Sequence, residues 1–138
     1  MSRRKGRVLA FQGLYSWDVG KNPLEEILAF TWPEAKDEEA EAFAGLVISG
    51  AVEHIEEIDG KISKHLSDSW TLERSNKVTL AILRSGVYEL MYQSSADSKI
   101  VIDEAVEIAK KYVVNGTFNL NSVFYPPEDV SYPAGTLH

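Results

Sequence analysis

Hydrophobic residues recur every three to four positions along most of the chain, which is the spacing of an α-helix. The first such segment covers residues 3–18, and Gly20 and the Asn22-Pro23 pair are typical of its end. A helical wheel places Val8, Phe11, Leu14, Tyr15 and Asp18 on one side and Lys5, Gln12, Gly13 and Ser16 on the other. The pattern therefore predicts an amphipathic first helix.

Proline and glycine divide the segments that follow. Pro23 suits the first turn of a short helix over residues 23–31, and Pro33 ends it. A longer helical segment follows over residues 37–59, and Asp59-Gly60 predicts a break before the sequence "KISKHL". The middle of the chain is therefore expected to be helical with short connections.

Two further segments differ in how their apolar residues are distributed. Residues 77–92 are apolar around almost the whole wheel, which is typical of a central, buried helix. Residues 99–112 are amphipathic, and the sequence "LNSVF" predicts a last short helix. The predicted apolar side of residues 99–112 and the position after them consists of Ile102, Ala105, Val106, Ala109 and Val113.

These elements predict an all-α protein of about six or seven helices in two small packed bundles. The domain is expected to span residues 1–124, with an N-terminal bundle at about 3–70 and a C-terminal bundle at about 71–124. Three prolines lie within residues 125–138, which we expect to form an extended or disordered tail.

Composition and charge narrow the class of protein. The 138 residues contain no cysteine and carry a net charge of -7, with 44% hydrophobic residues. No apolar run approaches the roughly 18 residues that a membrane span needs, so we expect a cytoplasmic protein without a membrane partner. The charge is unevenly distributed, because residues 1–21 carry five bases and one acid, and residues 22–62 carry two bases and eleven acids.

The sequence offers little for catalysis. His54 and His65 are eleven positions apart, which is too far for a zinc pair on one helix, and each histidine is expected to serve packing or the surface. Neither a phosphate-binding loop nor a nucleophile elbow is present. We therefore expect no enzyme activity, no metal and no cofactor.

The basic start favours nucleic acid. Arg3, Arg4, Lys5 and Arg7 can neutralise phosphates and release counterions. Further along the same helix, Gln12 can read a base edge and Tyr15 can stack on an unpaired base, a combination that suits single-stranded RNA. Two alternatives stay open at this point, namely a merely solubilising terminus and a core role for Tyr15.

Three motifs resemble the NusB family of bacterial transcription antitermination factors. They are "RRKGRVLAFQGLYSWD" at residues 3–18, "LRSGVYELMY" at 83–92 and "IDEAVEIAKKY" at 102–112. Their order and separation match the family over about residues 3–124. The ending differs, because the basic last helix of the family is replaced by a proline-rich, acidic segment.

The resemblance implies a function and partners. Family members bind boxA RNA together with the ribosomal protein NusE, join RNA polymerase in an antitermination complex and support ribosomal RNA synthesis. The resemblance also implies that RNA is contacted by the basic arm, which consists of Arg3, Arg4, Lys5 and Arg7, and by Gln12 and Tyr15. Further candidates are Arg84, for which an internal polar network with Glu89 is the alternative, and Phe118 and Asn121.

Other interpretations remain beside this one. The same fold occurs as the RNA-binding module of ribosomal RNA cytosine methyltransferases, although no methyltransferase domain follows here. A protein-only helical adaptor with an incidental basic arm is a second alternative. A homodimer is possible, since apolar helices can pack against a second copy.

Overall fold

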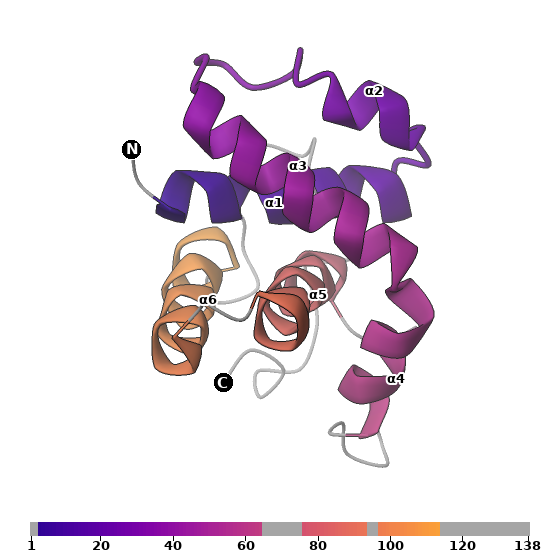
Figure 1. Cartoon of the computed structure of the whole chain (residues 1–138), viewed down its shortest axis with the longest axis vertical. Coiled ribbons are helices and arrows are strands. Elements are labelled where there is room, and N and C mark those ends of the chain that lie inside the picture. The colour runs from indigo at the N-terminus through magenta and orange to yellow at the C-terminus, as the bar shows by residue number, and fades with distance from the viewer. Residues whose placement is uncertain (1–2, 65–75, 94–96, 114–138) are drawn as a thin grey trace.

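The residues that the structure describes form six α-helices, in line with the six or seven that the sequence predicts for the whole chain. The computed structural model describes residues 3–64, 76–93 and 97–113, and these contain helices and no strand. The all-α prediction is confirmed (Figure 1). The helices are α1 (Arg3–Asp18), α2 (Leu24–Leu28), α3 (Glu38–Glu53), α4 (Ile55–Lys64), α5 (Lys77–Tyr92) and α6 (Ser98–Tyr112).

Side chains of the sequence fix where three helices begin. The Asp37 carboxylate accepts a hydrogen bond from the backbone N–H of Ala40 at 3.1 Å, and Asn76 does the same for Thr79 at 3.0 Å. Asp97 accepts from the N–H of Lys99 at 2.9 Å. Each bond satisfies an N–H that has no partner within its own helix, so α3, α5 and α6 start where the sequence supplies an Asx cap.

Helix α5 lies at the centre, as its apolar sequence predicts. It packs against α1, α3, α4 and α6, while α1 also packs against α3 (Figure 1). Phe11 and Leu14 of α1, Ile48 of α3 and Leu80 of α5 are at most 1% exposed. The apolar side of α1 therefore anchors this helix in the core, and the front of α1 is held in one place.

The helical wheel placed Gly13 on the side of α1 opposite its apolar residues, and this prediction was wrong. This residue is buried, and a Cβ added there would lie 2.4 Å from the Ile48 side chain and 3.1 Å from that of Ile27. The reason is close helix packing. Both α2 and α3 cover α1, and the part of its surface that they cover is wider than the side formed by its large apolar residues.

We expect Gly13→Ala to lower the free energy of unfolding by about 1–2 kcal/mol, because overpacking outweighs the gain in helix propensity. Gly60→Ala is the matched control, since Gly60 is also helical but has nothing within 4 Å of an added Cβ. It should raise the stability by about 0.5–1 kcal/mol. Thermal and urea unfolding measure both, and equal effects would contradict the packing.

The predicted break at Asp59-Gly60 was also wrong. Both residues lie inside α4, and the chain bends instead at His54, between α3 and α4. The backbone hydrogen bonds run through this bend, from the His54 N–H to Gly50 at 3.0 Å and from the Ile58 N–H to His54 at 3.0 Å. Gly60 is tolerated because it lies on the exposed side of α4, opposite the buried Ile58.

The predicted apolar side of α6 is confirmed only in part, since Val113 is buried and Ala105 and Ala109 pack against the core. Val101 and Ile108 are buried, whereas Ile102 is 52% and Val106 47% exposed to the solvent. The apolar arc of α6 is wider than the part that packs against α5 and against Phe11 of α1, and these contacts decide which side chains are covered. The predicted helix at 120–124, the tail at 125–138 and the boundary between bundles near residue 70 lie outside the described residues.

Among the helices that the structure describes, none is long and apolar enough to cross a membrane. The described residues contain no group of acidic or histidine side chains that could hold a metal ion. His54 packs its ring on Tyr92 at 4.4 Å between ring centroids, which agrees with the packing role expected for it, and His65 lies outside the described residues.

Candidate nucleic-acid interface

The first turn of α1 presents three exposed cationic residues, which we call the basic turn: Arg3, Arg4 and Lys5. No acid lies in this turn. Cations at a helix N-terminus oppose the helix dipole, so the basic turn does not serve the stability of α1. Its position is nevertheless fixed, because Gly6 and Arg7 directly after it are buried.

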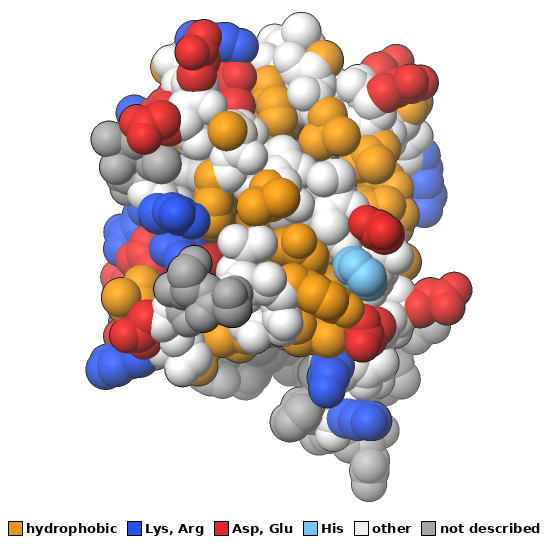
Figure 2. Space-filling model, viewed as in Figure 1, with side chains coloured by type: hydrophobic (Ala, Val, Ile, Leu, Met, Phe, Trp, Pro, Cys, Tyr) orange, Lys and Arg blue, Asp and Glu red, His pale blue; other side chains and the backbone are white. Residues whose placement is uncertain are grey.

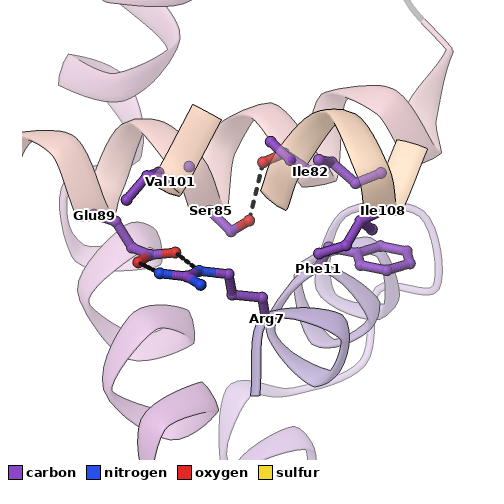
Figure 3. Close-up of a pocket in the computed structure, with 9 residues that line it drawn as sticks. Arg7, Phe11, Ile82, Ser85, Glu89, Val101 and Ile108 are labelled. Atoms are coloured by element: carbon purple, nitrogen blue, oxygen red, sulfur yellow. Dashed lines mark hydrogen bonds and ion pairs between the residues drawn. The ribbon is translucent and has the colours of Figure 1, made fainter. Parts of the chain in front are cut away.

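Arg7 holds the front of α1 against α5. Its guanidinium donates to both carboxylate oxygens of Glu89, at 2.9 Å and 2.8 Å (Figure 3). The Arg7 side chain is 11% exposed and that of Glu89 3%, so this is a buried, two-bonded ion pair. The hydrogen bonds to Glu89 raise the pKa of Arg7 above its ordinary value, which keeps the guanidinium charged.

A small cavity adjoins this pair. It measures about 10 Å³ and is lined by residues of α1, α5 and α6, including Phe11, Ser85 and Val101 (Figure 3). That volume is about one water molecule at most, so no nucleotide fits inside. Any RNA contact at this end of the molecule must therefore be made on the surface, by the basic turn and its surroundings.

Arg4 lies beside α6. Its guanidinium donates two hydrogen bonds to the Glu104 carboxylate, one of them at 2.9 Å from Nε, and its side chain stays 51% exposed. The hydrogen bond from Arg4 holds the pKa of Glu104 below its ordinary value. Arg4 therefore links α1 to α6 with a pair that solvent reaches.

Lys5 and Arg3, the other two cations of the basic turn, make weaker contacts. The Lys5 ammonium lies 3.7 Å from the Asp37 carboxylate and the Lys5 side chain is 69% exposed. The Arg3 guanidinium lies over the Phe43 ring at 4.6 Å from its centroid, a cation–π contact. Both side chains can leave these contacts at low cost, because exposed pairs are worth at most about 1 kcal/mol.

The structure separates Gln12 from Tyr15. Gln12 is partly exposed and shares the outer side of α1 with Lys5, two helical turns or about 10 Å away. Tyr15 is 3% exposed and belongs to the hydrophobic core. Of the two, only Gln12 stands on the same surface as the basic turn.

Arg84 lies on α5 among acids rather than at the surface. It donates to both oxygens of Asp59 at 2.8 Å and to Asp18 at 3.1 Å, and its side chain is 9% exposed. Burial lowers the pKa of Arg84, but the bonds to the two aspartates outweigh this and raise it. Arg84 and Glu89 thus both belong to internal polar contacts, although they pair with other residues and not with each other.

Sequence reasoning missed Asp37 and Glu104 as partners of the cations, and it proposed Glu89 as a partner of Arg84 and not of Arg7. Their distance in sequence from α1 gives no local signal, and only the motif containing Glu89 pointed to one of them. Phe118 and Asn121 lie outside the described residues.

Comparison with known proteins assigns the chain. The sequence profile described as the NusB family matches residues 4–120. The chain belongs to the NusB family. Among its relatives is the transcription antitermination protein NusB of Treponema denticola, 41% identical over 121 residues, which cover 86% of this chain and 88% of that protein. That of Borreliella burgdorferi is 43% identical, covering 77% and 78%.

Solved NusB structures agree in fold. NusB of T. maritima matches this NusB-family chain with a TM-score of 0.71 and 34% identity, covering 81% of this chain and 79% of that one. A crystal structure of the antitermination factors NusB and NusE in complex with double-stranded RNA matches with a TM-score of 0.66 and 36% identity, covering 79% and 81%. The curated relatives are antitermination factors, which is the function that the sequence motifs implied.

Proposed function

We propose that this chain is an RNA-binding transcription antitermination factor. It binds boxA-type single-stranded RNA in the cytoplasm, together with ribosomal protein NusE, as part of an RNA polymerase antitermination complex on ribosomal RNA operons, and it acts by binding without catalysis. The observation that carries the proposal is the basic turn on an acidic protein, anchored by the buried Arg7–Glu89 pair.

The residues take different parts in this proposal. Arg3, Arg4 and Lys5 contact phosphates, and Gln12 lies two turns further along the exposed side of α1, where it contacts a base. Arg7 positions the basic turn through Glu89. Tyr15 and Arg84 hold α1 and α5 in the core rather than contacting RNA.

In this proposal, the acidic residues next to the basic turn limit its affinity for RNA. Glu104 and Asp37 neutralise Arg4 and Lys5 in the free protein. A phosphate must take the place of these carboxylates, so RNA binding by the chain alone is weak. A protein partner that contacts the same RNA adds its own binding energy, which explains why NusE is needed.

The test is a titration of this chain with a boxA-type RNA strand, with and without NusE, at several salt concentrations. We expect tighter binding when NusE is present, and a logarithm of the affinity that falls linearly with the logarithm of the salt concentration. A duplex RNA of the same sequence is the comparison, since the solved NusB–NusE relative was crystallised with double-stranded RNA.

One observation favours a second function, a protein-only adaptor, because Arg4, Lys5 and Arg7 each have a carboxylate partner within the chain. Absence of RNA binding at low salt, both with and without NusE, would favour that adaptor and contradict the proposal. Formation of a complex with NusE alone would then identify its partner.

A further inference from the structure

An open apolar groove lies on the outer face of α2 and α3, and its acidic end adjoins the basic turn, since Glu38 follows Asp37, the partner of Lys5. It has a volume of about 550 Å³. Figure 2 shows hydrophobic side chains gathered on this face, with acidic side chains near its edges. The groove is lined by Leu28, Phe30, Ala42, Gly45, Leu46 and Ser49, with two glutamates at one end.

The groove is formed by the side of α3 that the core does not use. Ala44, Val47 and Ile48 are buried on the inner side, against α1. Leu46 points the other way and is 50% exposed, which is high for a leucine in the middle of a helix. No described residue covers it, so α3 presents an apolar stripe on its outer side as well as its inner one.

Backbone strain holds an aromatic ring at this groove. Phe30 has φ 50°, in the left-handed region that a bulky residue rarely adopts. The Trp32 indole N–H donates a hydrogen bond to the Ile27 carbonyl at 3.0 Å. The Phe30 and Trp32 rings pack against each other at 5.6 Å between centroids. Gly45 leaves room beneath, since its added Cβ would lie 3.6 Å from the Phe30 ring. Strain of this kind concentrates at binding sites.

The surroundings of the groove are strongly acidic. Residues 24–49 contain seven acids and one base, Lys36. Lys36 is already bound to Glu41 at 2.8 Å, whereas Glu38 at the same end of the groove is exposed. A ligand that fits this groove is therefore apolar at its centre and cationic at its edges.

We propose that this groove binds a cationic, amphipathic segment of a protein partner. An apolar side chain of that segment packs between Leu46 and Phe30, and its Lys or Arg residues face Glu38 and the other acids around the groove. RNA does not fit, because its phosphates carry the same charge as the rim. A second copy presents the same acidic face, so a symmetric contact brings like charges together. The chain thus has two neighbouring surfaces of opposite charge, one for RNA and one for a basic protein segment.

The test uses a synthetic helical peptide of about four turns with Leu on one side and Lys on the other, titrated into the full chain. A second peptide carries Glu in place of every Lys. We expect the Lys peptide to bind and the Glu peptide to fail. Leu46→Ser should weaken binding of the Lys peptide by about fivefold or more, because it removes the anchor contact.

The matched control is Ile102→Ser, which removes an equally exposed apolar side chain, 52% exposed, from α6. It should leave peptide affinity unchanged to within about twofold, and Leu46→Ser should leave RNA affinity unchanged. Equal effects of both substitutions, or equal binding of both peptides, would show unspecific attraction and overturn the proposal. A dimer of the free chain that Leu46→Ser dissociates would also overturn it.

Discussion

Arg7→Ala is expected to lower the free energy of unfolding by about 3–5 kcal/mol, the largest effect of any single substitution discussed for this chain. Removing the guanidinium leaves the Glu89 carboxylate, 3% exposed, buried without its two hydrogen bonds. Glu89 lies between α1, α5 and α6 next to Val101, where water has little access (Figure 3). Urea unfolding monitored by circular dichroism measures the loss.

Two comparisons make this prediction specific. Lys99→Ala removes an exposed pair with Asp103, in which the side chains are 82% and 61% exposed, and should leave the free energy of unfolding nearly unchanged. Arg7→Met combined with Glu89→Leu removes both charges and should recover most of the stability, since no unpaired charge remains. Equal losses for Arg7→Ala and Lys99→Ala would show that the Arg7–Glu89 pair does not hold α1 to α5.

Replacing the whole basic turn, Arg3, Arg4 and Lys5, by alanine should lower the affinity for boxA-type RNA by about a hundredfold near 0.1 M salt. On single strands, each lost phosphate contact removes about 0.7 from the salt slope, so the slope should fall by about 2. The helix itself should persist, because cations at its N-terminus do not stabilise it. Titrations at several salt concentrations, with unfolding curves beside them, measure both effects.

Glu104→Gln should change the RNA affinity in the opposite direction to Arg4→Ala, and it serves as the control for that substitution. It removes the negative charge of the Arg4–Glu104 pair, whereas Arg4→Ala removes the positive one, so the guanidinium is kept and no longer has to exchange the Glu104 carboxylate for a phosphate. We therefore expect Glu104→Gln to raise RNA affinity by about two- to fivefold and Arg4→Ala to lower it. If the two substitutions change the affinity in the same direction, Arg4 acts through the α1–α6 contact and not through RNA.

Local patterns predicted most of the fold. The apolar wheel of residues 77–92 predicted the central helix with the bounds it has, and the first helix was expected where α1 lies. The wrong predictions concern which helix packs against which side of its neighbour. Gly13 was placed outside and Val106 inside, because a wheel shows which residues share a side but not which helix covers it. At His54 the chain bends without a glycine or proline that would mark the position.

The candidate interface was predicted in part. The sequence identified the cations at the start of α1, and the family motifs turned them into an RNA-binding hypothesis. It treated Arg7 as equal to Arg3, Arg4 and Lys5, since all four are cationic and adjacent. Their separation into one buried anchor and three exposed residues follows from the position of Glu89, which is 82 residues away in sequence.

The sequence by itself determined the helices, the excess of acids around a basic start and the membership of the NusB family, because these depend on spacing, composition and motifs along one chain. Only the tertiary structure decided which charges face each other and which apolar sides stay open. Arg7 pairs with Glu89 and Leu46 stays exposed because of how α1, α3 and α5 pack. Packing brings together residues that are far apart in sequence, and no local pattern records those contacts.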